Sequence, residues 1–120
     1  MSSRVPKSRI IAPQFLLMAY GHSYFPMADA KSGEIGWYSP DPRGIFDLEH
    51  FKTHRSLRQT IQKNVFEIRI IQRFEEVIRS CARREETWIS EDIIQTYVQL
   101  HQEGHAHSVE SLKKDTLAGG

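Results

Sequence analysis

The sequence has little of several features that mark specialised protein classes. Cys81 is its only cysteine, so no disulfide can form within the chain and nothing requires an oxidising compartment. No apolar run reaches the roughly 18 residues that a membrane-spanning helix needs. Glycine patterns that cradle nucleotide phosphates, such as Gly-x-Gly-x-x-Gly, are also missing. We therefore expect a cytoplasmic protein without a bound nucleotide cofactor.

An excess of charge of one sign is missing as well. Lys and Arg number 16 against 15 Asp and Glu, which gives a net charge of +1, far from the balance of proteins that coat nucleic acid. Residues 1–60 carry a net charge of +3 and residues 61–120 a net charge of −2. Any contact with nucleic acid is therefore expected to be a local basic patch.

What is present fits a single globular unit or a piece of a larger one: 120 residues, of which 39% are hydrophobic and 26% charged. Basic residues before the partly apolar run over residues 10–20 imitate a signal peptide. Pro13 and Gln14 interrupt that run, which argues against export. Residues 1–11 are expected to form a flexible tail.

Hydrophobic periodicity predicts a mixture of helices and short strands. Helices are expected over residues 13–21, 54–63, 73–82 and 90–104. Strands are expected over residues 35–38, 66–70 and 105–112, with another opening at residue 116. Prolines and glycines between residues 21 and 44 exclude long elements there. Since the last strand is too short to pair well, we expect the sequence to stop inside a domain.

Three histidines suggest a metal site, because an i, i+4 pair on a helix can share a zinc ion. Gly104 is expected to end the helix between His101 and His105, so we expect no metal there. His105 and His107 would instead share one face of the following strand. Cys81 falls on the apolar face of its helix, where a buried thiol is expected to be unreactive.

Basic side chains gather in one short window. Lys52, His54, Arg55, Arg58 and Lys63 lie within twelve residues. On the predicted helix, Arg55 and Arg58 are i, i+3 neighbours that present one cationic edge. Such an edge suits phosphate oxygens, but a merely solvated basic face has the same pattern.

Aromatic side chains form a second group of candidates. Trp37 and Tyr38 lie in a segment bounded by prolines, and Trp88 lies between a charged loop and a helix start. Aromatic rings on loops can stack on nucleic-acid bases. Tryptophan more often packs into a core, and the residues alone leave both alternatives open.

Five blocks of sequence, in the same order and with matching spacing, resemble the leucyl/phenylalanyl-tRNA–protein transferase family. They are residues 24–29, 37–43, 54–58, 86–90 and 100–110. The most specific are Ser-Pro-Asp-Pro-Arg in the second block and Gly-His-Ala-His-Ser in the last. The resemblance covers roughly residues 12–120.

The resemblance implies an α/β (α+β) chain with a small N-terminal α/β domain over residues 12–46. Residues 47–120 would be the N-terminal part of an acetyltransferase-like domain that uses no coenzyme A. The implied enzyme takes leucine or phenylalanine from charged tRNA and joins it to the N-terminal Arg or Lys of a protein, which marks that protein for degradation in bacteria. An aminoacyl ester is already activated, so the enzyme mainly aligns an amine and stabilises the oxyanion; no cofactor or metal is implied.

Carried over by position, the resemblance implies two groups of site residues. Those near the 3′-terminal adenosine of aminoacyl-tRNA would be Met27, Trp37, Tyr38 and Trp88. Those at tRNA phosphates would be Lys52, Arg55, Arg58 and Lys63.

The sequence also departs from the family. Met27 stands where some members carry an aromatic residue, and Leu112 where tryptophan is common. The family's Gly-Glu-Ser-Met-Phe-Ser block and its catalytic carboxylate are missing, so no catalytic residue is assigned and a C-terminally truncated, weakly active or inactive member is expected. The alternatives are a non-catalytic fragment that binds the tRNA acceptor end and an unstable product without activity.

Overall fold

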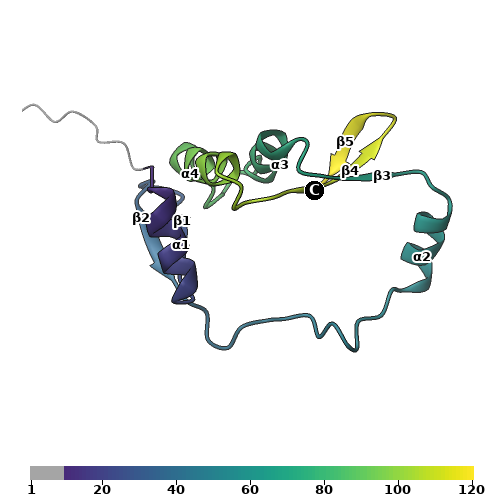
Figure 1. The fold of residues 1–120 in the computed structure, drawn as a ribbon, viewed down its shortest axis with the longest axis horizontal. Helices are drawn as coiled ribbons and strands as arrows, with labels where there is room; N and C mark the ends of the chain where they lie inside the picture. The colour runs from purple at the N-terminus through teal and green to yellow at the C-terminus, as the bar shows by residue number, and fades with distance from the viewer. Residues whose placement is uncertain (1–9) are drawn as a thin grey trace, which may run out of the picture. The chain divides into compact units, whose positions relative to one another are not determined.

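The computed structural model describes residues 10–120, so most of the expected tail lies outside the described residues. These residues form four helices and five short strands in two antiparallel sheets, which confirms the predicted α+β class (Figure 1). They divide into two compact units. The first unit joins the chain up to Ser39 with Phe74–His107, and the second joins Pro40–Arg73 with Ser108–Gly120. The units alternate along the chain, whereas the domains predicted from sequence are consecutive and stay a prediction.

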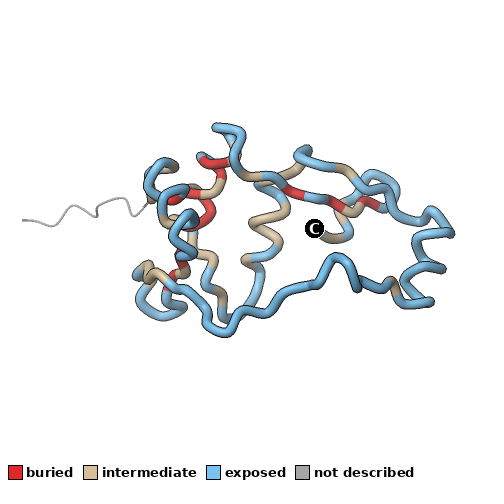
Figure 2. Tube along the Cα trace, turned by 60° about the horizontal axis from the view of Figure 1, so that its bottom comes forward, coloured by how far each residue is buried: buried red, intermediate tan, exposed pale blue. Residues whose placement is uncertain are grey.

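The first unit consists of three helices and a two-stranded hairpin. Its elements are α1 (Pro13–Gly21), β1 (Phe25–Ala28), β2 (Ile35–Tyr38), α3 (Phe74–Cys81) and α4 (Glu91–Gln102). The helix α1 begins at Pro13, a residue whose fixed φ suits a first turn. Leu16, Pro26, Ile93 and Thr96 are fully buried and form the centre of the unit, as the red segments of Figure 2 show.

The strand β1 was not predicted, because Pro26 lies in its middle. The structure explains why proline is tolerated there. The N–H of Ala28 points away from β2 and donates to the carbonyl of Trp88. Pro26 lies two residues earlier, so its missing N–H would face the same outer edge and removes no bond between the two strands.

The helix α4 begins and ends as predicted. The hydroxyl of Ser90 accepts a hydrogen bond from the N–H of Ile93 at 3.2 Å, which confirms Ser90 as the N-cap. Glu91 and Asp92 lie in the first turn, where the helix dipole favours negative charge. The N–H of Ile11 donates to Thr96 Oγ1 at 3.0 Å, so the segment before α1 is fastened to α4.

The second unit consists of one helix and a three-stranded sheet. Its elements are α2 (Arg55–Gln62), β3 (Glu67–Ile70), β4 (Val109–Lys113) and β5 (Thr116–Gly119). The strands pair antiparallel in the order β3-β4-β5. Leu112 is buried, whereas Ile68 and Ile70 are about 60% exposed and Arg69 is less exposed than either. The period-2 pattern therefore predicted the strand, but its apolar residues lie on the open face.

A buried carboxylate ties β4 to the segment that follows β3. Glu110 is fully buried; it accepts a hydrogen bond from the hydroxyl of Ser108 and another from the N–H of Gln72 at 3.1 Å. The Ser108 hydroxyl, followed by backbone N–H groups, lowers the pKa of Glu110. A buried charge needs such partners, so this residue has a structural explanation.

Two sequence-based expectations about side chains are wrong. The strand predicted over residues 105–112 begins only at Val109, so His105 and His107 do not share a strand face. The residues before Val109 are hydrogen-bonded to the end of α4 instead. The N–H of His105 caps this helix, and the carbonyl of Ala106 contacts His101 Nδ1 at 2.8 Å. Cys81, the last residue of α3, is exposed rather than buried.

None of the helices formed by residues 10–120 has the length and the hydrophobicity that a bilayer crossing requires.

The helix α2 shows how exposed some apolar residues are. Leu57 and Ile61 form its apolar stripe, as predicted, yet they are 51% and 60% exposed. No residue of α2 is buried.

Candidate functional site

The hairpin β1-β2 is set by a turn that begins at Asp29. Its carboxylate accepts hydrogen bonds from the N–H groups of Lys31 and Ser32, both at 2.9 Å, and the N–H of Gly33 donates to its carbonyl at 2.8 Å. The Ser32 N–H, followed by that of Lys31, lowers the pKa of Asp29. Gly33 has a φ of 74°, which favours glycine. These bonds fix the register of the two strands.

The register separates the predicted site residues onto two faces. Phe25 pairs with Tyr38 and Met27 with Gly36, so these four residues share one face of the hairpin. Trp37 pairs with Pro26 and therefore lies on the other face. Met27 is half-buried and Tyr38 is 44% exposed. The structure thus brings Met27 and Tyr38 together, and places Trp37 on the opposite side.

Trp88 lies next to the outer edge of β1. Its carbonyl accepts the hydrogen bond from the N–H of Ala28 at 3.0 Å, although the two residues are sixty positions apart. Trp88 is 42% exposed. Met27 directly precedes Ala28, so the structure brings the segments of Met27 and Trp88 side by side. An exposed ring at this place is available to a ligand.

The loop that carries Trp88 is fastened at its base. It joins α3 to α4, and Arg79 on α3 donates to both carboxylate oxygens of Glu91 on α4, at 2.9 and 3.1 Å. Arg79 also donates to Glu75 at 2.8 Å. The bond from Arg79, followed by one from Gln95, lowers the pKa of Glu91, and these pairs raise the pKa of Arg79. The two ends of the loop are thereby held together.

Trp37 lies against α1 instead. Its ring meets that of Phe15 edge to face, with centroids 5.5 Å apart. Two open hollows flank this pair, of about 670 Å³ and 460 Å³. Glu34 and Ile35 line the first, and the second is lined by apolar residues with His22. Sequence reasoning missed Phe15, because the pairing appears only once α1 and β2 are packed.

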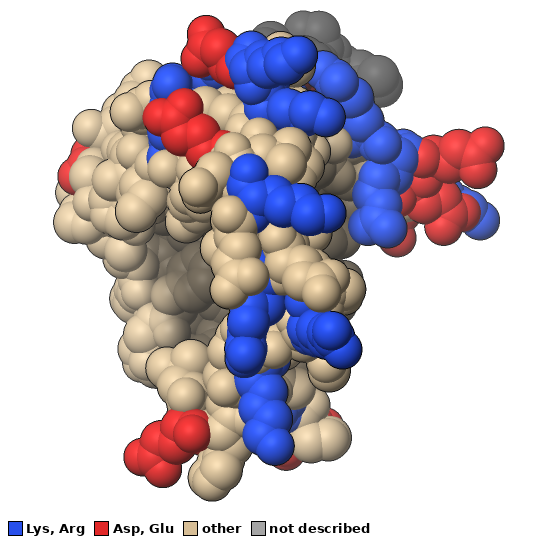
Figure 3. All heavy atoms as spheres, turned by 90° about the vertical axis from the view of Figure 1, so that its right-hand side faces the viewer, with Lys and Arg blue, Asp and Glu red and all other residues tan. Residues whose placement is uncertain are grey.

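The predicted phosphate contacts lie in the second unit. Arg55 and Arg58 are on α2, Lys52 precedes it and Lys63 is its C-cap; all four are exposed. Within the described residues, none of the four makes an ion pair. In Figure 3, which looks onto the side of Figure 1 where α2 lies, Lys and Arg side chains follow one another along the surface. These cations are therefore free to bind anions, and their role stays a prediction.

The two units differ sharply in charge. The second unit has nine Lys and Arg against six Asp and Glu, a net charge of +3. In the first unit, residues 10–39 and 74–107 have four against nine, a net charge of −5. A polyanion is therefore attracted more strongly to the second unit than to the described part of the first.

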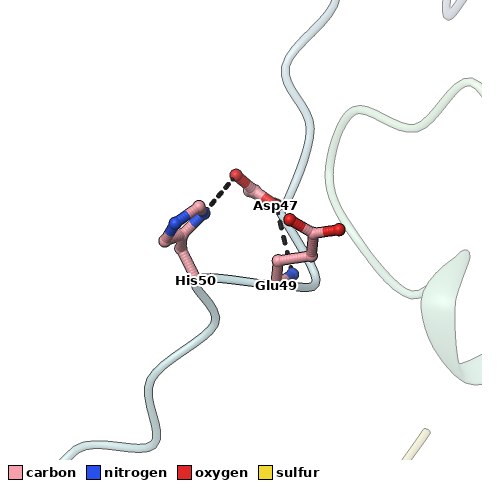
Figure 4. A group of neighbouring side chains, drawn as sticks. All are labelled: Asp47, Glu49 and His50. Carbon is pink, nitrogen blue, oxygen red and sulfur yellow. Dashed lines mark hydrogen bonds and ion pairs between the residues drawn. The ribbon is translucent and has the colours of Figure 1, made fainter.

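The candidate metal ligands are not where the histidine pattern suggested. His101 stacks on Phe74, with ring centroids 4.4 Å apart, and contacts the carbonyl of Ala106. Among residues 10–120, only Asp47, Glu49 and His50 place three possible ligand atoms within 4.8 Å of one another (Figure 4). These side chains are exposed, and Asp47 already accepts bonds from Glu49 N–H at 3.1 Å and His50 at 2.7 Å. Such an exposed turn is ordinary without a metal.

Comparison with known proteins identifies relatives over nearly the whole chain. Residues 10–41 match the family model of the leucyl/phenylalanyl-tRNA protein transferase N-terminal domain, and residues 45–120 match that of leucyl/phenylalanyl-tRNA protein transferase. Proteins named leucyl/phenylalanyl-tRNA–protein transferase from Gloeobacter violaceus and Rubrobacter xylanophilus are each 46% identical over 92% of this chain. One from Chlorobaculum tepidum is 44% identical over the same share.

The matched region is only part of each relative. It covers 57% of the Gloeobacter protein, 58% of the Rubrobacter protein and 59% of the Chlorobaculum protein. The chain therefore spans somewhat less than three-fifths of the length of these curated relatives. The two family models together cover almost all described residues, in the expected order. The chain thus belongs to the leucyl/phenylalanyl-tRNA–protein transferase family.

Proposed function

We propose that this chain is part of a cytoplasmic aminoacyltransferase that moves leucine or phenylalanine from charged tRNA to the N-terminal Arg or Lys of acceptor proteins and so marks them for degradation. The observation that carries the proposal is the hydrogen bond from the N–H of Ala28 to the carbonyl of Trp88, which puts the Trp88 backbone at the edge of the strand that carries Met27; Trp88 and Tyr38 are both exposed. Aromatic and sulfur-containing side chains at one place suit a nucleobase. Family membership supports the substrate class.

In this proposal the two units have different tasks. The aromatic group of the first unit holds the 3′-terminal adenosine, and the cations of α2 bind backbone phosphates of the tRNA. Because the aminoacyl ester is already activated, the remaining work is to align the acceptor amine and to stabilise the oxyanion. No residue of this chain is assigned a catalytic role.

The first experiment measures binding of the 120-residue chain to leucyl-tRNA as a function of salt. Arg55→Gln with Arg58→Gln should reduce the slope of log affinity against log salt by about 1.4 to 1.8, since each lost phosphate contact contributes about 0.7 to 0.9. The matched control, Arg83→Gln with Arg84→Gln, removes the same charge from exposed residues of the first unit and should change the slope little. Equal effects of both pairs would contradict specific phosphate contacts by α2.

The second experiment measures transfer of leucine to a peptide that begins with arginine. We expect little or no transfer by this chain alone, because it spans less than three-fifths of its relatives. Binding without transfer favours a non-catalytic fragment that binds the tRNA acceptor end. Robust transfer would show that the remaining two-fifths of the relatives is dispensable, and absence of binding at low salt would exclude both functions.

A further inference from the structure

The hairpin face that carries Met27 and Tyr38 contains one residue without a side chain. Gly36 lies directly opposite Met27 in the register and two residues before Tyr38 on the same face. Its φ is outside the left-handed region, so the backbone itself does not require glycine here. The reason for glycine at this position must therefore lie in the side chains that surround it.

The ring of Tyr38 occupies the space above Gly36. A Cβ atom added at Gly36 would lie 2.9 Å from the Tyr38 hydroxyl oxygen, 3.1 Å from Cε2 and 3.2 Å from Cζ. The first distance is shorter than real Cβ atoms essentially ever show, and the other two are tighter than nine in ten Cβ contacts. Any side chain at position 36 would lift the ring.

Other contacts hold the ring in this pose without covering it. The ring of Phe25, directly opposite in the register, packs against it with centroids 6.4 Å apart and a tilt of 40°. Tyr38 nevertheless remains 44% exposed. Because Met27 faces Gly36 across the hairpin, the ring that covers Gly36 lies on the same face of the hairpin as Met27.

We propose that Gly36 is a positioning residue for the 3′-terminal nucleobase of the tRNA, acting through Tyr38. The missing side chain lets the Tyr38 ring lie across the hairpin beside Met27, where its exposed face stacks on the base, with Trp88 at the neighbouring edge of β1. This inference rests on the proposed function and adds Gly36 and a stacking role for Tyr38 to it.

The test measures binding of the chain to a short RNA that ends in a 3′ adenosine and to the same RNA with an abasic 3′ end. Tyr38→Ala removes the ring and should weaken binding of the adenosine probe about tenfold, within the range known for base stacking. Gly36→Ala should weaken it by severalfold. Neither variant should alter binding of the abasic probe.

A rescue separates positioning from a loss of structure. Tyr38→Phe removes the oxygen nearest to the added Cβ and leaves the ring face intact, so it is the reference with which the double variant is compared. In Gly36→Ala with Tyr38→Phe, the ring needs to shift by only a few tenths of an ångström, and most of the affinity should return. Thermal melts of all variants, with Gly21→Ala as a control at a glycine that has no neighbour within 4 Å, check that the fold is kept.

The outcomes distinguish the two proposals. If Trp88→Ala and Tyr38→Ala lose affinity for the adenosine probe and Gly36→Ala does not, only the role of Gly36 is overturned. The same holds if the double variant binds the probe no more tightly than Gly36→Ala alone. Wild-type affinity in Trp88→Ala and Tyr38→Ala overturns the proposed aminoacyl-end site itself. An equal loss with the abasic probe shows that the hairpin does not bind the base.

Discussion

Gly104 adopts a left-handed backbone conformation, with a φ of 85°, just after α4 ends. Its N–H donates to the carbonyl of His101 at 2.9 Å, and the N–H of His105 donates to the carbonyl of Leu100 at 3.0 Å. This pair of bonds is a Schellman motif, which satisfies carbonyl groups that the helix leaves without partners. Glycine ends α4 here because residues with a side chain are strained at positive φ.

Gly104→Ala should therefore lower the free energy of unfolding by about 1 kcal/mol, the usual cost of a side chain in the left-handed region. Chemical denaturation followed by circular dichroism measures the change. Gly21→Ala is the control: Gly21 is helical, has no neighbour within 4 Å and should leave stability unchanged or raise it slightly. Similar losses in both variants would contradict the explanation by positive φ.

The two tryptophans show how far a single residue can be interpreted from sequence. Neighbouring residues suggested the same alternatives for both, base stacking or core packing. The structure separates them: Trp37 packs against Phe15 on the α1 side of the hairpin, whereas Trp88 is exposed beside β1. The difference arises from strand register and from a hydrogen bond between distant segments, and neither is visible locally.

At the scale of elements, α3 and α4 are joined by an exposed cluster of charges. Arg79 on α3 donates hydrogen bonds to Glu91 on α4 and to Glu75 on α3. The pKa of Glu91 is lowered by Arg79 first and by Gln95 second, from an ordinary value of about 4.5. A carboxyl whose pKa falls on folding stabilises the fold at a pH above its unfolded pKa, and the contribution disappears as pH falls through the folded pKa.

Glu91→Gln should therefore lower the melting temperature slightly at pH 7, because exposed ion pairs contribute little. The difference from the wild type should stay constant down to about pH 5 and vanish as the pH falls below about 4.5, in melts recorded across that range. Glu85→Gln, at an exposed loop glutamate, removes the same charge and is the control for the effect of net charge. A difference that persists at pH 2.5 would show that Glu91 acts through packing.

Element boundaries were predictable where the determining signal is local. The helix over residues 13–21, the strand over residues 35–38 and the cap at Ser90 agree with the structure. The start of β4 was not predictable, because residues 105–108 are bound to the end of α4 and to Ile71. Their alternating pattern was overridden by those hydrogen bonds.

At the scale of the whole molecule, charge follows the two units and not the two halves of the chain. Residues 1–60 have a net charge of +3, but the basic unit combines residues 40–73 with 108–120. Between Tyr38 and α2, the chain forms neither helix nor strand. Ile45, Phe46 and Leu48 in this segment are 80% exposed or more. Exposed backbone without helix or strand is cleaved by proteases before folded elements are.

Limited trypsin treatment should therefore cut after Arg43 and Lys52 before it cuts after Arg79. Cleavage within α3 first requires local unfolding of a helix whose Arg79 is held by two carboxylates, whereas the bonds after residues 43 and 52 are already accessible. Mass spectrometry of early digests identifies the order. Early cleavage at Arg79 would show that α3 opens more readily than the segment before α2.

The sequence by itself determined the family, the α+β class and most helix ends, because motif spacing, hydrophobic period and capping residues act over a few positions. Only the tertiary structure decided which candidates meet. Met27 and Trp88 lie sixty-one residues apart, yet the N–H of Ala28, next to Met27, donates to the carbonyl of Trp88, while Trp37, next to Tyr38, faces the other way. The reason is physical: strand alternation separates adjacent side chains, and packing joins distant ones, so proximity in the chain is a poor guide to proximity in a site.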